Sequence, residues 1–199
     1  RGDQGLLFLL FMLGIGKAAL MPFHFWLPAA MVAPTPVSAL LHAVAVVKAG
    51  VFCVLKVSVY VFGTELVASP ATGNWLIYAA SFTVVVASLV ALYQDNLKRR
   101  LAYSTVGQLG YIVLGAALGT KLAIIGGGMH IVMHAFGKIT LFFCAGAIYV
   151  ATGKTKVSQL VGMGRQMPVT FLAFGVASLS IIGLPPLGGA WSKWYLGLG

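Results

Sequence analysis

Charged side chains are scarce in this sequence. They make up 8% of its 199 residues, whereas a soluble globular domain carries about 25%. Acidic residues are the scarcest, since only Asp3, Glu65 and Asp95 occur. A chain with 60% hydrophobic residues has too few polar groups to cover its surface in water. The composition therefore excludes a soluble domain and indicates a protein whose solvent is lipid.

Cysteines and cofactor motifs are scarce as well. Cys53 and Cys144 fall inside apolar runs, far from any loop, so we interpret both as small buried apolar residues rather than as a disulfide or metal pair. The glycines 126–128 are not followed by GK[ST], which excludes a phosphate-binding loop and favours close helix packing. No residue pattern suggests flavin, iron–sulfur or nicotinamide binding. We expect no cofactor, no metal and no catalytic residue in this chain.

The formal net charge of +10 does not indicate a nucleic-acid partner. Several of the 13 Lys and Arg residues lie inside apolar runs, where no polymer could reach them. Others gather in two short loops, 95–100 and 154–165, which two predicted spans separate and which therefore lie on the same side. Because basic loops mark the cytoplasmic side of membrane proteins, we expect both loops to face the cytoplasm.

About six apolar segments have the length of roughly 20 residues that a helix needs to cross a bilayer. They cover residues 5–20, 35–62, 75–93, 101–118, 121–150 and 168–184. We predict an all-α polytopic membrane protein with a single transmembrane domain over residues 1–199, in a bacterial or archaeal cell membrane. The sequence does not begin with Met, and its last apolar segment has barely restarted at Gly199. We therefore expect a fragment of a longer polytopic protein.

Two of these segments contain prolines that interrupt a helix. Pro22 predicts a break near residues 21–23, followed by a short helix over 23–31. Pro185 and Pro186 predict a second break before the segment AWSKWYL. Proline removes a backbone donor and clashes with the preceding turn, and a break at membrane depth is tolerated only in contact with protein or a wet cavity. Paired interrupted segments are typical of inverted-repeat transporters, although the identity between these two is too weak to establish a repeat.

The segment MHIVMHAFGKITLFFCAGAIYV, residues 129–150, carries three titratable side chains inside an apolar run. His130, His134 and Lys138 have the spacing i, i+4, i+8, which places them on one face of a helix. Ionisable groups inside a membrane are costly and usually mark an ion or proton pathway. The spacing therefore predicts a column of exchangeable protons, because His and buried Lys both titrate near neutrality.

Other interpretations of this column remain open. HxxxH can bind zinc, but this helix lacks the third ligand and the general-base Glu. A haem iron held by two histidines needs them on different helices. A buried structural hydrogen-bond network is the stronger alternative to a proton relay.

Five further ionisable residues lie in or beside apolar segments. Lys48 lies near the middle of its span, where a charge costs about 2.5–3.5 kcal/mol, so we assign it to the pathway. Lys17 and Lys193 each lie beside a proline break, where free helix carbonyls offer a cation a partner. His42 is six residues before Lys48 and so faces a different neighbour. Lys56 is nearer a segment end, and we expect it to reach the lipid headgroups.

The sequence resembles a known family at five places. GKAALMPFHFWLP, APTPVSALLHAVAVVKAGVF, DNLKRRLAYSTVGQLGY, MHIVMHAFGKITLFF and LPPLGGAWSK are similar to the antiporter-like membrane subunits of respiratory complex I, of Mrp-type sodium/proton antiporters and of membrane-bound hydrogenases. The resemblance covers nearly all of the chain in order. In that family, fourteen or more helices form two inverted five-helix repeats, each with a broken helix. The present chain looks like the seventh to the twelfth helix.

The resemblance implies a place in the proton pathway for seven residues. Lys17 matches the central protonatable lysine on the first broken helix, and Lys193 the terminal lysine on the second. His42 and Lys48 match the next helix, which links the two half-channels. His130, His134 and Lys138 match the connecting histidines and lysine of the second half. The family's glutamate that pairs with the equivalent of Lys17 belongs to a helix that would precede residue 1.

We therefore predict a proton-translocating, antiporter-like subunit of a multisubunit membrane complex, which conducts protons along a midplane file of Lys, His and water. Its partners would be other membrane subunits, the lipid bilayer, and protons or sodium ions. Sodium/proton exchange of the Mrp type is the first alternative. A non-conducting scaffold for redox subunits, such as those of an NADH-quinone oxidoreductase or a hydrogenase, is the second.

Overall fold

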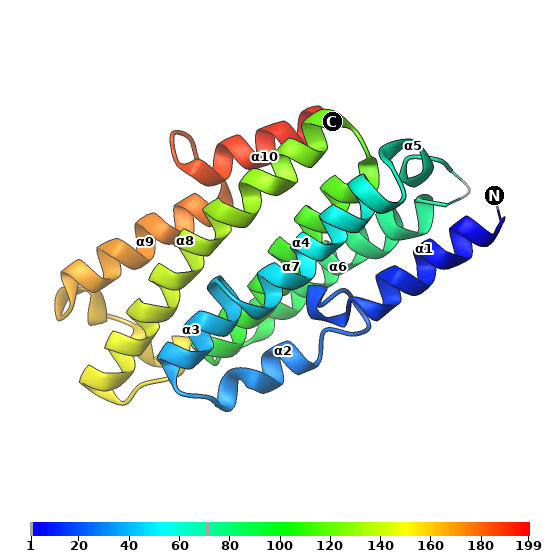
Figure 1. The fold of residues 1–199 in the computed structure, drawn as a ribbon. Helices are drawn as coiled ribbons and strands as arrows, with labels where there is room; N and C mark the ends of the chain where they lie inside the picture. Colours follow the sequence, from blue (N-terminus) through cyan, green and yellow to red (C-terminus); the bar gives the residue numbers. More distant parts are fainter. Residues whose placement is uncertain (1, 71) are drawn as a thin grey trace.

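The computed structural model describes residues 2–70 and 72–199, and its regular elements there are helices (Figure 1). The ten α-helices of the described part are α1 (Gly2–Gly14), α2 (Trp26–Ala29), α3 (Thr35–Ala43), α4 (Val46–Lys56), α5 (Thr64–Val67), α6 (Asn74–Tyr93), α7 (Leu97–Leu118), α8 (Lys121–Thr152), α9 (Pro168–Ile182) and α10 (Gly188–Leu198). The predicted all-α class is confirmed.

Four helical segments are long and apolar enough to cross a membrane, namely Thr35–Val61, Asn74–Tyr93, Leu97–Leu118 and Lys121–Thr152. They confirm a polytopic membrane protein. Two shorter apolar helices, Asp3–Gly14 and Pro168–Ile182, accompany them. A stretch that contains proline follows each of them, with Pro22 after the first and Pro185 and Pro186 after the second.

The chain leaves α1 earlier than the proline alone predicts. The helix ends at Gly14, and the 3-10 turn Gly16–Ala18 follows it. Ala19 then adopts a left-handed conformation with φ 54°, which no α-helix can continue. Pro22 lies in the turns between α1 and α2. Gly14 and Gly16 explain the early end, because glycine is a poor helix former.

The second interruption separates α9 from α10. Gly183 ends α9 with φ 98°, and its N–H donates to Leu179 O, as in many helix ends where only glycine adopts this conformation without strain. Pro185 and Pro186 follow, and α10 begins at Gly188. A Cβ at Gly189 would lie 1.7 Å from Ser180 O. The start of α10 therefore packs directly on the end of α9.

The segment predicted as one helix over residues 35–62 is divided in two. α3 ends at Ala43, and the N–H groups of Val44 and Ala45 both donate to Leu40 O, at 3.2 and 3.0 Å. The next helix, α4, starts at Val46 and passes into a π-helical turn over Val57–Val61. No proline or glycine occurs at residues 44–45, so the bend has no local sequence signal.

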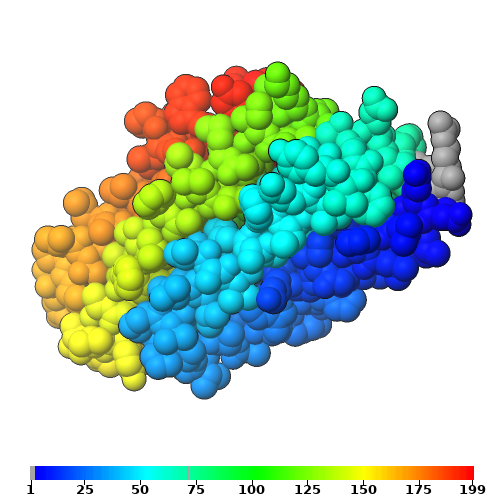
Figure 2. Space-filling view, in the orientation of Figure 1, coloured from blue at the N-terminus to red at the C-terminus, as the bar shows by residue number. Residues whose placement is uncertain are grey.

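Helices α6, α7 and α8 form consecutive antiparallel hairpins (Figure 1). Helices α9 and α10 lie along successive parts of α8, as the orange and red segments beside the yellow-green one show in Figure 2. Polar caps and glycines fix the hairpin turns. Asn96 accepts a hydrogen bond from Arg99 N, and Thr120 accepts one from Ala123 N, each at 3.2 Å. Gly119 is left-handed, with φ 68°.

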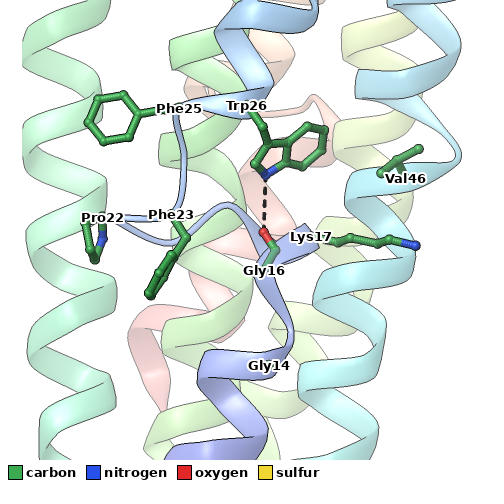
Figure 3. A pocket seen from close by; sticks show the side chains of 8 residues that line it. All are labelled: Gly14, Gly16, Lys17, Pro22, Phe23, Phe25, Trp26 and Val46. Carbon is green, nitrogen blue, oxygen red and sulfur yellow. Dashed lines mark hydrogen bonds between the residues drawn. The ribbon is translucent and has the colours of Figure 1, made fainter.

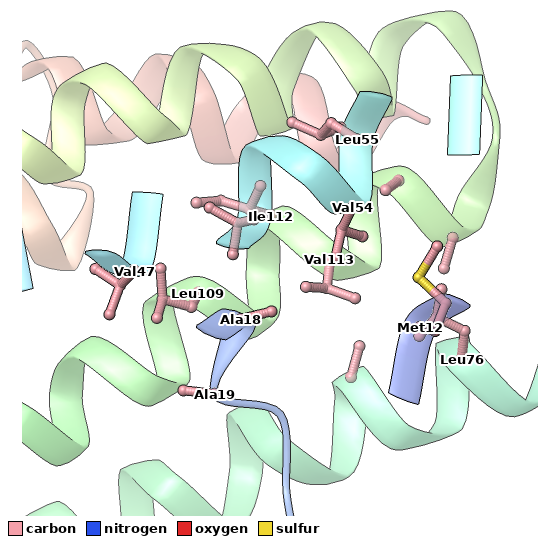
Figure 4. Close-up of a cluster of buried hydrophobic side chains, with 14 of the residues drawn as sticks. Met12, Ala18, Ala19, Val47, Val54, Leu55, Leu76, Leu109, Ile112 and Val113 are labelled. Carbon is pink, nitrogen blue, oxygen red and sulfur yellow. The ribbon is translucent and has the colours of Figure 1, made fainter. Parts of the chain in front are cut away.

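The largest apolar core lies where α7 meets α4, α6 and the turn after α1 (Figure 4). Its centre is formed by Leu109, Ile112 and Val113 of α7, with Val47 and Val54 of α4 packed on them. Burial of such side chains fixes α7 as the middle of the bundle. The helices that carry the candidate pathway are therefore held by a packed interior.

Two loops are joined at one end of the bundle. The amide and hydroxyl of Ser158 donate to the carboxylate of Asp95, at 3.0 and 2.9 Å. Backbone bonds run from Val157 N to Asp95 O and from Leu97 N to Thr155 O. These hydrogen bonds hold the pKa of the exposed Asp95 carboxyl below its ordinary value. The contact joins the two basic loops that the sequence predicts to share one side.

The outer surface of the bundle is rich in large apolar side chains. Phe136 is 69% exposed, Tyr78 73% and Leu172 72%, as expected where lipid replaces water. Cys144 is buried as predicted. The prediction for Cys53 was wrong, because this residue lies on an exposed face of α4. In lipid a small apolar residue can face either way, so hydrophobicity alone does not decide its burial.

Candidate functional site

The column predicted on α8 lies inside the bundle. His130 and His134 are each 1% exposed and Lys138 is fully buried. α8 packs against α3, α7, α9 and α10, so its three titratable side chains meet other helices and not lipid. The helical spacing thus predicted correctly that they share a face. It could not predict their partners.

Lys48 of α4 meets this column at its middle member. Its Nζ lies 2.5 Å from Nδ1 of His134, and Lys48 is only 6% exposed. An ammonium has three donors and no acceptor, so a protonated Lys48 donates to a neutral His134 whose proton is on Nε2. That Nε2 is buried and has no hydrogen-bond partner among the described residues.

His130 is joined to two other helices. Its Nε2 lies 2.9 Å from Gln108 Oε1 on α7, and its Nδ1 lies 2.9 Å from Ser192 Oγ on α10. The rings of His130 and His134 stack, with centroids 6.0 Å apart. The two histidines are thus neighbours on α8 without a direct hydrogen bond between them.

The contacts of Ser192 are compatible with two protonation states of His130. Its hydroxyl lies within hydrogen-bond distance of Gly189 O, at 3.1 Å, and of His130 Nδ1. A serine has one hydrogen to donate. If it donates to Gly189 O, Nδ1 of His130 must supply the other hydrogen. The same heavy-atom positions therefore accommodate a neutral or a charged His130.

Lys138 is surrounded by neutral acceptors. Its Nζ donates to Leu101 O at 3.0 Å and to Ser104 Oγ at 2.9 Å, both on α7. These two bonds leave one of the three N–H groups of an ammonium without a protein acceptor among the described residues. A buried charge requires compensation, and the two protein acceptors of this ammonium are both neutral.

His42 of α3 has no hydrogen-bond partner among the described residues. It is fully buried, and neither ring nitrogen is bonded to any of them. Its ring lies 5.2 Å from that of Phe142 on α8. His42 and Lys48 therefore contact different residues of α8, as their spacing predicts.

The side chain of Lys193 contacts the C-terminal end of α9. Its Nζ donates to Ile181 O at 2.8 Å and to Ile182 O at 3.1 Å, and it lies 5.1 Å from the ring of Tyr111. The last carbonyls of a helix lack intrahelical donors and carry partial negative charge. A lysine beside the break thus finds the helix-end partner that the sequence predicts.

Lys17 lies apart from these residues. It is exposed on the 3-10 turn and lines a groove of about 660 Å³ with Pro22, Trp26 and Val46 (Figure 3). Trp26 Nε1–H donates to Gly16 O at 3.2 Å across this groove. Lys17 therefore lies outside the row of buried lysines and histidines that α3, α4 and α8 form.

Lys56 and His24 lie outside the row as well. Lys56 is exposed, with its ammonium 4.8 Å from the ring centroid of Tyr60 and 5.6 Å from that of Phe52. Lys56 thus lies at the surface of the bundle, and its contact with the lipid headgroups stays a prediction. His24 is 7% exposed, and its ring lies against Phe25.

Sequence reasoning missed the polar side chains that contact the row. Ser104, Gln108 and Tyr111 lie on α7, and Ser192 on α10. The first three have the spacing i, i+4, i+7, which places them on one helix face. Weakly polar residues on one face of an otherwise apolar span were therefore the available signal.

Comparison with known proteins identifies relatives over nearly the whole chain. The family model described as NADH:quinone oxidoreductase/Mrp antiporter, TM, matches residues 2–197. The chain is 44% identical to NADH-quinone oxidoreductase subunit N of Desulforudis audaxviator over 195 residues, which are 98% of this chain and 38% of that protein. It is 41% identical to a probable K(+)/H(+) antiporter protein of Rhizobium meliloti, covering 95% of this chain and 18% of the relative.

Solved structures give the same result. The Mrp complex from Dietzia sp. contains a chain that matches with a TM-score of 0.88 and 39% identity, over 97% of this chain and 21% of that one. The archaeal membrane-bound sulfane sulfur reductase contains one that matches with a TM-score of 0.84 and 32% identity, over 94% and 38%. The chain thus spans well under half the length of these relatives.

Proposed function

Since the chain belongs to the NADH:quinone oxidoreductase/Mrp antiporter membrane family, we propose that it forms the proton-conducting part of an antiporter-like subunit. Protons would pass along the buried lysine and histidine side chains, with water between them. The protein is a multi-pass membrane protein, and its relatives are subunits of multisubunit membrane complexes.

The proposed membrane topology has six crossings. Four are the long helical segments, and α1 with α2 and α9 with α10 would make two more as broken helices. The non-helical residues between each pair, with Pro22 and with Pro185 and Pro186, would lie inside the membrane against protein. Contact of the start of α10 with Ser180 O supports this arrangement for the second pair.

The contact between Lys48 and His134 carries the proposal. It joins two helices by a donor and an acceptor that can exchange one proton, and neither residue has an acidic partner among its hydrogen bonds. Lys48 of α4 and Lys138 of α8 are both buried, and His134 lies between them. These three side chains would repel one another if all of them were charged. We therefore expect these side chains to pass a proton on rather than to retain it, as a proton pathway requires.

The residues proposed for this pathway are Lys17, His42, Lys48, His130, His134, Lys138 and Lys193. Lys193 would lie at one end, where Tyr111 and the α9 carbonyls hold it. Lys17 would belong to the other half-channel, whose remaining helices would supply its acidic partner. The chain would carry no cofactor, and any redox chemistry would lie in other subunits of the complex.

Cation/proton exchange is the second candidate function. The observation that favours it is the similarity to the Mrp complex and to a probable K(+)/H(+) antiporter protein. Coupling to sodium or potassium would need the same proton file, since an exchanger also moves protons.

The test uses Lys138→Met in the assembled complex, reconstituted in vesicles. We expect proton flux to fall at least tenfold, because the variant removes an exchangeable proton from the file. Lys56→Met, which changes an exposed lysine of the same bundle, is the matched control and should leave flux unchanged. Unchanged flux in a correctly assembled Lys138→Met complex would overturn the proposal and leave a scaffold. A sodium or potassium requirement of the flux would identify an exchanger.

A further inference from the structure

A second cavity lies beside the two basic loops, and none of the seven residues proposed for the pathway lines it. It has a volume of about 310 Å³ and lies between the start of α7, the end of α8, the start of α9 and the loop after α8. Six apolar side chains line it, Leu97, Ile148, Val157, Leu160, Phe171 and Phe174, together with Arg100. We call it the interfacial pocket. Two of the elements that line it, the yellow end of α8 and the orange start of α9, lie at one end of the bundle in Figure 1.

Arg100 is held in place by the end of α6. Its Nε donates to Gln94 O and its Nη2 to Leu92 O, both at 2.9 Å. A guanidinium has five N–H donors, so these two bonds fix its position and leave others for an anion. The pocket thus combines apolar walls with one positioned cation.

The surrounding loop has the character of a membrane-surface segment. Val161 is 87% exposed and Val169 79%, in the same stretch as the exposed Lys156 and Arg165. Exposed apolar residues mixed with basic ones are typical of segments at the level of the lipid headgroups. The pocket therefore opens where headgroup and acyl chain meet.

The local charge is strongly positive. Lys156 adjoins the lining residue Val157 in sequence, and the turn Met163–Arg165 lies against Phe171. The nearby acid, Asp95, already accepts two hydrogen bonds from Ser158. The basic side chains on the two joined loops are Lys98, Arg99, Arg100, Lys154, Lys156 and Arg165.

We propose that the interfacial pocket binds one anionic phospholipid, with part of an acyl chain against Phe171 and Phe174 and the phosphate near Arg100. An amphiphile is the ligand that uses both the apolar walls and the cation. Basic pockets between transmembrane helices are a known mode of anionic-lipid binding. The volume holds a portion of one chain, so the rest of the lipid stays in the bilayer.

Photo-crosslinking in the reconstituted complex tests this site. The probes are phosphatidylglycerol and phosphatidylcholine, each with a diazirine on one acyl chain, and labelled residues are located by mass spectrometry. We expect phosphatidylglycerol to label Phe171 and Phe174 at least fivefold more than phosphatidylcholine does. Leu172, on the exposed face of the same helix, is the internal control and should be labelled equally by both. Equal labelling of all three residues would overturn the proposal.

Two variants separate the walls from the charge. Leu160→Trp fills the pocket and should abolish the preferential labelling of Phe171 and Phe174. The double variant Lys156→Gln with Arg165→Gln keeps the walls and should lower the preference for phosphatidylglycerol by about fivefold or more, since each basic residue contributes about 1 kcal/mol near an anionic surface. Labelling that persists unchanged in both variants would contradict the site. The charge variant keeps the test decisive if Leu160→Trp fails to assemble.

Discussion

The side-chain nitrogen of Lys48 lies 2.5 Å from Nδ1 of His134, although 86 residues separate them in the chain. This contact joins α4 to α8 across the apolar interior. A lysine and a histidine at this distance cannot both be fully charged without strong repulsion. The pair therefore carries at most one positive charge, and the removal of either partner leaves the other without its hydrogen bond.

We expect Lys48→Met and His134→Ala to act as one unit. Each single variant should lower proton flux by about tenfold or more, and the double variant should be little worse than either, because residues in one network are coupled. Proton flux into vesicles, normalised to the amount of assembled complex, measures the cycle. Strictly multiplicative losses would show that the contact is incidental.

The hydroxyl of Ser104 should matter through Lys138. In Ser104→Ala the ammonium loses one of two neutral acceptors, which costs about 1–3 kcal/mol for a buried charged group. We expect slower flux and a lower melting temperature of the complex. Ser178→Ala, which removes a hydroxyl bonded only within α9, is the control. Equal effects of both variants would assign Ser104 a merely local role.

Two glycines of α8 give a matched test of helix contact. A Cβ at Gly126 would lie 2.7 Å from Leu196 N and 2.9 Å from Ser192 O. Gly126→Ala should therefore push α10 from α8, separate Ser192 from His130 and destabilise the complex by about 1–3 kcal/mol. Gly128 has no atom of another element within 4 Å of its Cβ position, so Gly128→Ala should be neutral or stabilising by about 0.5–1 kcal/mol. Thermal unfolding of the two variants decides this.

The loop contact of Asp95 should weaken in acid. Its pKa is lowered by the hydrogen bonds from Ser158, so its contribution to stability is present above the ordinary pKa of a carboxyl and is lost as pH falls through the lowered value. We expect Asp95→Asn to melt below the unmodified protein at neutral pH and to approach it at low pH. Asp3 and Glu65 are common to both proteins and cancel. A difference in melting temperature that is independent of pH would be inconsistent with this role.

Spacing along the sequence predicted much of the site, since it placed the three titratable residues of α8 on one face and Lys48 deep in a span. Partners on other helices could not be predicted, because the contact of His130 with Ser192 depends on how α10 returns to α8. The exposure of Lys17 was not foreseen either, since its position beside a break says nothing about which side of the turn faces the bundle.

The elements themselves were predicted where the chain gives chemical signals. Prolines indicated the breaks near Pro22 and Pro185, and the basic residues of 95–100 indicated a loop between two spans. The bend at Val44 has no such signal, because it arises from two amides sharing one carbonyl and from the packing of α3 and α4 against different neighbours. Local helix propensity does not predict a bend that depends on tertiary packing.

The single hydroxyl hydrogen of Ser192 has a mechanical consequence. When His130 is charged, the hydroxyl is released to Gly189 O, and the first turn of α10 gains a bond; when His130 is neutral, the same hydrogen can turn toward the ring and that bond is lost. We therefore expect the rigidity of this turn to follow the charge of the histidine. Occupancy of one proton position would then alter the elasticity of the C-terminal helix.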